Sequence, residues 1–108
     1  MNGFDNREKG FEAKYSVDQE LEFKVIARRN RLLGAWAAEQ MGLSGEAVDS
    51  YAKEVVAADF EKPGQDDVVE KLLADMTAKG VDISEHLIRV EMDRCYEEAA
   101  RQISEEEA

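Results

Sequence analysis

Apolar side chains at helical spacing are the feature that most constrains the fold of this chain. From Val17 to Ile103 they recur every three or four residues, which places them along one face of an α-helix. Gly42, the Pro63–Gly64 pair and Gly80 interrupt this pattern at points where helices commonly stop. We therefore predict helices over about residues 17–41, 45–61, 66–79 and 84–104. Short connections make neighbouring helices antiparallel, so the expected fold is all-α, a four-helix bundle-like domain.

Residues that can cap a helix stand before each predicted stretch. Ser16 and Asp82 are each followed three residues later by Gln or Glu, the capping-box spacing in which two side chains bond free backbone amides. Ser44 and Asp66 stand at the other two predicted starts. The side chains expected to face the core are Val17, Leu21, Val25, Leu32 and Trp36, then Val48, Tyr51, Ala52, Val55 and Phe60, then Val69, Leu72, Leu73 and Met76, and finally Ile88, Met92, Cys95, Ala99 and Ile103.

The first fifteen residues differ from the rest of the chain. Phe4, Phe11 and Tyr15 would lie within about 20° of one another on a helix, but Gly3 and Gly10 weaken any helix there. We expect residues 1–15 to be a mobile N-terminal segment and residues 16–108 to be the helical domain. The segment could become ordered in the groove of a partner, and the alternative is that its aromatic side chains fold back over the bundle.

The charge of the chain excludes some classes of partner. The formal net charge is −11, and all of it lies after the first sixteen residues, which hold three acidic and three basic residues. A body this acidic repels nucleic acid, because such binding depends on basic side chains that displace counterions. A lone Cys95 can form no intramolecular disulfide, and no export signal or membrane-length apolar run is evident. We expect a cytoplasmic protein without direct membrane insertion.

Catalytic and metal-binding patterns are weak. His86 is the only histidine, and Cys95 lies about 2.5 turns further along the same predicted helix, so the two cannot form a nucleophile–base pair. The best metal-like pattern has the spacing of a calcium loop, but Pro63 occupies a ligand position within it. Its acidic and glycine residues are Asp59, Glu61, Gly64, Asp67 and Glu70. We therefore expect no enzymatic activity, no metal site and no cofactor.

Arg28, Arg29 and Arg31 form the remaining cluster of interest. None of them has an acidic residue four positions earlier, so their partners must come from outside the local helix. Acidic faces of neighbouring helices or solvent are the simplest partners. The alternative is a ligand-binding role, in which these arginines hold a nucleotide phosphate or a partner's carboxylates and the chain acts as a helical sensor or adaptor.

Five sequence runs are more specific than a generic helix pattern: Phe4-Asp5-Asn6-Arg7-Glu8, Phe11-Glu12-Ala13-Lys14-Tyr15, Phe23 to Asn30, Gly34 to Glu39 and Tyr51 to Val56. These runs resemble the zeta-subunit inhibitor family of the alphaproteobacterial ATP synthase. The resemblance extends over nearly the whole chain and includes the Pro63–Gly64 and Gly80–Asp82 turns.

This resemblance implies a four-helix bundle with a mobile N-terminal inhibitory segment. In the family, that segment enters a catalytic interface between the alpha and beta subunits near the gamma rotor and blocks hydrolytic rotation. The partner would be the soluble sector of the synthase, and the protein would lie at the cytoplasmic face of the inner membrane. The corresponding contact residues here are Phe4, Asp5, Arg7, Glu8, Phe11, Lys14 and Tyr15.

Overall fold

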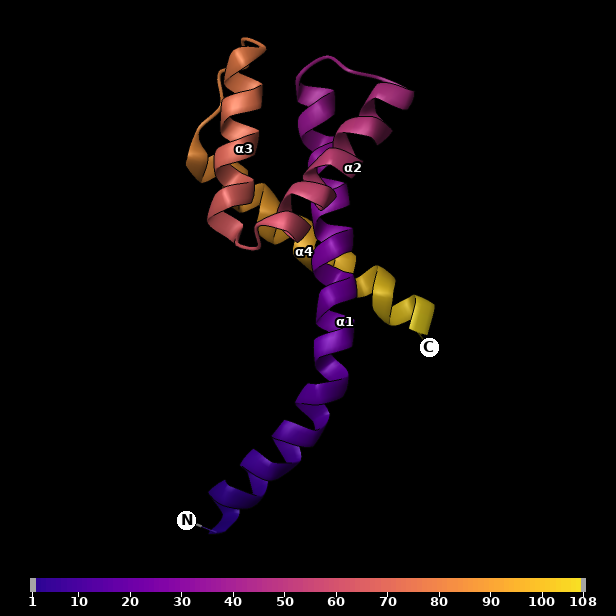
Figure 1. The fold of residues 1–108 in the computed structure, drawn as a ribbon, viewed down its shortest axis with the longest axis vertical. Coiled ribbons are helices and arrows are strands. Elements are labelled where there is room, and N and C mark those ends of the chain that lie inside the picture. Colours follow the sequence, from indigo (N-terminus) through magenta and orange to yellow (C-terminus); the bar gives the residue numbers. More distant parts are fainter. Residues whose placement is uncertain (1, 108) are drawn as a thin grey trace.

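Four α-helices account for nearly all of the regular structure (Figure 1). The computed structural model describes the backbone of residues 2–107 and the side chains of residues 19–107. The helices are α1 (Asn2–Gln40), α2 (Glu46–Glu61), α3 (Gln65–Ala78) and α4 (Glu85–Glu107). No strand occurs between residues 2 and 107, which confirms the prediction of an all-α fold. None of these helices has, within the described residues, a stretch apolar enough to cross a membrane.

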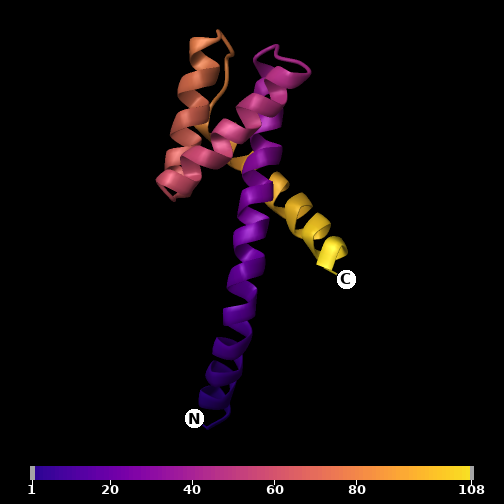
Figure 2. The ribbon, with the colours of Figure 1, turned by 45° about the vertical axis from the view of Figure 1, so that its right-hand side comes forward.

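Helix α1 is the axis on which the other helices are assembled. It contacts α2, α3 and α4, and the two ribbon views show α2 and α4 crossing it (Figures 1 and 2). In both views the N-terminal part of α1 extends past the other three helices. Because α1 begins at Asn2, Ser16 lies inside this helix, and the prediction that a helix starts at Ser16 is wrong. Serine side chains cap free amides at helix ends, whereas amides inside a continuous helix already bond to backbone carbonyls.

The core is built from apolar side chains of all four helices. Leu33, Val55, Leu72, Met76 and Ile88 are among its fully buried members. A smaller cluster of Val25, Ala99 and Ile103 joins α1 to the C-terminal half of α4. All five side chains that the sequence assigns to the interior of the last helix are buried, so that prediction is confirmed.

Phe60 is the clear exception among the predicted core residues whose side chains are described, a set that leaves out Val17. Its side chain is 70 % exposed, although the apolar pattern places it with Val55 on the inner face of α2. The two residues are five positions apart, which on an α-helix is a rotation of about 140°. Phe60 therefore points away from the core that Val55 enters, and the prediction is wrong for that reason.

Helix starts differ from the predicted capping pattern. Ser84 Oγ accepts the backbone N–H of Leu87 at 3.1 Å, so Ser84 caps α4 in place of the predicted Asp82. Gly45 and Gly64, both with positive φ, precede α2 and α3, and no side chain caps either start. Ser44 and Asp66 therefore do not have the predicted capping role. Glycine reaches these backbone conformations without strain from a Cβ atom, which allows tight turns at both points.

Gly34 allows α1 and α2 to approach closely. A Cβ atom at this buried position would lie 2.9 Å from the Ala52 Cα atom and 3.1 Å from a Val55 methyl carbon. The nearest atom belongs to the α2 backbone, so the contact cannot be relieved by rotating a side chain. The distance between the two helices therefore depends on the missing side chain at residue 34.

Replacing Gly34 with alanine should destabilise the protein even though alanine favours helix. The added methyl group must push α2 away from α1, and such overpacking costs about 1–3 kcal/mol of unfolding free energy. Urea unfolding followed by circular dichroism measures this loss. Glu39→Ala, at an exposed position of the same helix, is the matched control and should leave the midpoint nearly unchanged. Equal midpoints for Gly34→Ala and the native chain would contradict the packing argument.

Candidate functional site

The predicted partner-binding residues lie on the N-terminal part of α1. Phe4, Asp5, Arg7, Glu8, Phe11, Lys14 and Tyr15 fall within its backbone span, but their side chains lie outside the described residues. Their role as an inhibitory segment, and the division of the chain at residue 15, stay predictions. The side chains of residues 19–107 show which contacts fix α1, the helix that carries these residues, to the rest of the domain.

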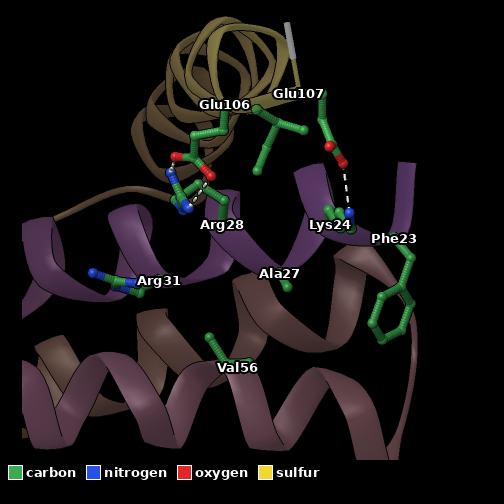
Figure 3. Close-up of a pocket in the computed structure, with 9 residues that line it drawn as sticks. Phe23, Lys24, Ala27, Arg28, Arg31, Val56, Glu106 and Glu107 are labelled. Carbon is green, nitrogen blue, oxygen red and sulfur yellow. Dashed lines mark hydrogen bonds and ion pairs between the residues drawn. The ribbon is translucent and has the colours of Figure 1, made fainter. Parts of the chain in front are cut away.

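Arg28 ties α1 to the last turns of α4. Its guanidinium donates to both carboxylate oxygens of Glu106, at 2.8 and 3.1 Å, and to Gln102 Oε1 at 2.7 Å. One turn earlier, Lys24 Nζ forms an ion pair with Glu107, and Figure 3 shows both contacts between the two helices. The hydrogen bond from Arg28 lowers the pKa of the Glu106 carboxyl. Arg28 therefore finds its partners on a neighbouring helix, the simpler of the two roles predicted for it.

Arg29 is a buried arginine with no ion pair among the described residues. It is 2 % exposed, and its Nε and Nη2 atoms donate to Asn30 Oδ1 at 3.1 and 3.0 Å. Burial lowers the pKa of the Arg29 guanidinium, while the negative charge of Asp59 acts in the opposite direction. Asn30 connects the two charges, because its Nδ2 atom donates to Asp59 Oδ2 at 2.7 Å.

Asp59 also fixes the turn between α2 and α3. Its second carboxylate oxygen accepts the backbone N–H of Gly64 at 3.1 Å. Asp59, the first acidic residue of the calcium-loop pattern, is thus already bonded to Asn30 and Gly64. No group of three or more metal-ligating side chains is found within residues 19–107.

Arg31 is exposed and forms no ion pair within the described part of the chain. It lines one pocket with Arg28, whereas Arg29 lines a different one. Neither of these pockets, nor the third one beside them, is lined by all three arginines, because Arg29 points about 100° away from Arg28 around the helix. The alternative in which they jointly hold a nucleotide stays a prediction.

Two phenylalanines that the sequence analysis did not assign to a functional site lie together on the surface. Phe23 and Phe60 are 59 % and 70 % exposed, and their rings meet edge to face with centroids 6.1 Å apart. Phe23 is two residues from the buried Val25, about 200° around α1, so a helical projection would have placed it off the core stripe. The two rings meet because of the way α2 crosses α1, and the spacing of apolar residues within one helix does not specify that crossing.

Cys95 and His86 are separated as predicted. Cys95 is buried between helices, and His86 is exposed in the first turn of α4. The pKa of the Cys95 thiol is raised to about 11, mainly because the side chain is buried. A thiol in this environment stays protonated near neutral pH and is a poor nucleophile. The assignment of Cys95 to the core is therefore confirmed.

The native Cys95 thiol should react slowly with a water-soluble disulfide reagent such as Ellman's reagent. At pH 8 almost no thiolate is present in the folded state, and the surrounding helices restrict access. Absorbance should show slow labelling of the native protein and rapid, stoichiometric labelling in guanidinium chloride. Labelling of the native protein as fast as that of the unfolded chain would show that Cys95 is not in the core.

Asn30→Ala should destabilise the protein strongly. The substitution removes the acceptor of two Arg29 N–H groups and a donor to Asp59, leaving a buried charge with fewer partners. We expect a loss of about 2–4 kcal/mol in urea unfolding experiments. Arg31→Ala is the matched control on the same helix, since that side chain is exposed, and it should change the unfolding free energy by less than about 0.5 kcal/mol. Similar losses in the two variants would rule out a special role for the Asn30 network.

Comparison with known proteins identifies the family. The family described as ATPase inhibitor subunit zeta matches residues 1–102. One similar solved structure, titled only as a solution NMR structure of a protein, is 41 % identical, has a TM-score of 0.70, and is matched over 80 % of this chain and 98 % of that chain. No curated protein gives a significant match. Because the family match covers almost the entire sequence, this chain belongs to the ATPase inhibitor subunit zeta family.

Proposed function

We propose that this chain inhibits ATP hydrolysis by the F-type ATP synthase and that residues 1–15 are its inhibitory element. The segment enters a catalytic interface between an alpha and a beta subunit near the gamma rotor and blocks rotation in the hydrolytic direction. The observation that carries this proposal is the family match, which begins at residue 1 and so includes every predicted contact residue. The role is regulatory, and the chain is peripheral to the membrane at the cytoplasmic face.

The continuity of α1 supports a stiff connection between the inhibitory element and the helical body. Nucleating a helix is unfavourable, whereas extending an existing one adds a hydrogen bond for each residue fixed. The packed part of α1, from Val25 to Ala38, supplies that nucleus. The segment can therefore hold a helical form in the partner at a lower entropic cost than a free peptide of the same sequence.

Burial of the three aromatic side chains supplies the driving force in this mechanism. Phe4, Phe11 and Tyr15 each contribute about 1.5–3 kcal/mol of gross transfer free energy when buried. Fixing the backbone costs about 1–2 kcal/mol for each residue that is not already helical, which offsets part of this gain and leaves the segment alone with a modest net affinity. The contacts of the helical body with the synthase must then contribute to tight binding.

Deletion of residues 1–15 should abolish inhibition while leaving the helical body folded. Among the α1 side chains that the structure describes, from residue 19 onward, burial begins at Val25, so the truncation removes no described core contact. ATP hydrolysis by the isolated soluble sector should fall when the full chain is added and stay at its initial rate with the truncated chain. Circular dichroism of the truncated protein is the control for folding. Undiminished inhibition by a folded, truncated chain would reject the proposed inhibitory element.

A triple substitution tests the aromatic contacts without shortening the chain. Phe4→Ala, Phe11→Ala and Tyr15→Ala together should weaken inhibition by at least about a hundredfold, because two or three hot-spot contacts are lost. The matched control is Asn6→Ala in the same segment. A triple variant as potent as the control would show that the segment does not act through its aromatic side chains.

A further inference from the structure

One face of the α1–α2 pair is hollowed by three adjoining pockets of about 520, 570 and 920 Å³. Val56 lines all three of them, and Phe23, Ala27, Arg31 and Phe60 each line two. These five residues define a continuous apolar trough between α1 and α2. Figure 3 shows part of it, with Phe23, Ala27 and Arg31 on α1 and Val56 on the facing helix.

The aromatic side chains of the trough are exposed without an evident role in folding. Phe23 and Phe60 are more than half exposed and contact each other by their rings. Contiguous apolar surface on a soluble domain is a mark of an interaction site, and aromatic residues are enriched where binding energy concentrates. Within residues 19–107 the other two exposed large apolar residues, Leu87 and Val90, lie on α4 and line none of these pockets.

Arg31 supplies a positive charge at the trough and forms no ion pair among the described residues, although the carboxylates of Asp49, Glu61 and Glu106 line the same pockets. Arg28 and Lys24 also line the trough, but their charges are satisfied by Glu106 and Glu107. Arginine binds carboxylates with a planar, two-pronged geometry and is common at the centres of protein interfaces. A partner that complements this surface carries an apolar side chain next to a carboxylate.

We propose that the trough is a second docking surface for the soluble sector of the ATP synthase. An apolar side chain of the synthase inserts between Phe23 and Phe60, and a synthase carboxylate pairs with Arg31. This inference rests on the proposed function, and it names the part of the helical body that completes the binding begun by residues 1–15.

Continuity along α1 favours the synthase as the occupant. Phe23 follows Tyr15 by eight residues of the same helix, an axial rise of about 12 Å. A partner protein that encloses residues 1–15 therefore needs to extend its contact surface only a short distance along α1 to reach the trough. A second copy of this chain is disfavoured, because a formal charge of −11 on each copy makes them repel.

The test measures binding of full-length variants to the isolated soluble sector. Phe23→Ala, Phe60→Ala and Arg31→Glu should each raise the dissociation constant by about tenfold or more, as expected for hot-spot contacts. Leu87→Ala and Lys79→Glu are the matched controls, since both positions are exposed and line none of the trough pockets; they should bind like the native chain. Thermal unfolding shows whether each variant retains its fold, and Arg31→Lys should bind more tightly than Arg31→Glu.

The outcomes separate this inference from the proposed function. If the native chain neither binds nor inhibits the soluble sector, the proposed function fails and the inference fails with it. If the native chain inhibits and the trough variants bind as well as the controls, only the trough inference is overturned. It is also overturned if sedimentation shows a native dimer that Phe60→Ala dissociates, because the trough then serves a second copy of the chain.

Discussion

The close packing of α1 against α2 at Gly34 is the constraint on which the rest of the fold depends. Without a side chain at this position, the backbone of α2 can lie directly on α1 and bring Val55 into the core. The same crossing sets where the end of α2 lies, and so where Phe60 meets Phe23. One missing methyl group thus determines both the interior of the bundle and the shape of its exposed apolar face.

Polar contacts hold α1 to the elements on either side of it. Arg28 bonds Gln102 and Glu106 of α4, while the Arg29–Asn30–Asp59 network joins α1 to the turn after α2. The first contact is largely exposed, and such ion pairs contribute little stability. The second is buried, and it restricts the geometry more strongly, because an unsatisfied buried group is costly. Neighbouring arginines of one run thus have different structural roles, and only Arg31 is left to face a partner.

Repetition in the sequence explains which parts of this arrangement were predictable. The stripe from Ile88 to Ile103 repeats at helical spacing over more than four turns, and every member is buried. Phe60 departs from the pattern because five residues separate it from Val55. The predicted start of α4, at about residue 84, lies within one residue of Glu85, but the predicted cap is wrong because Asp82 and Ser84 are both residue types that can cap a helix. The partners of Arg28 lie more than seventy residues away in the sequence, so only the crossing of α4 over α1 reveals them.

The mechanical role proposed for this family member places two demands on one helix. In this proposal residues 1–15 enter a partner, so their side chains must not be needed in the core of the bundle. Residues 25–38 must be packed firmly enough to resist the force of a blocked rotor. A single continuous α1 meets both demands, because its later turns are held by α2 on one side and α4 on the other. In the proposed mechanism the aromatic segment alone binds with modest net affinity, and a rigid body with its own contact surface would combine two weak contacts into one tight attachment. The trough beside Phe23 lies at the junction between the two parts of α1. A second contact so close to the first costs little additional conformational entropy of the chain between them.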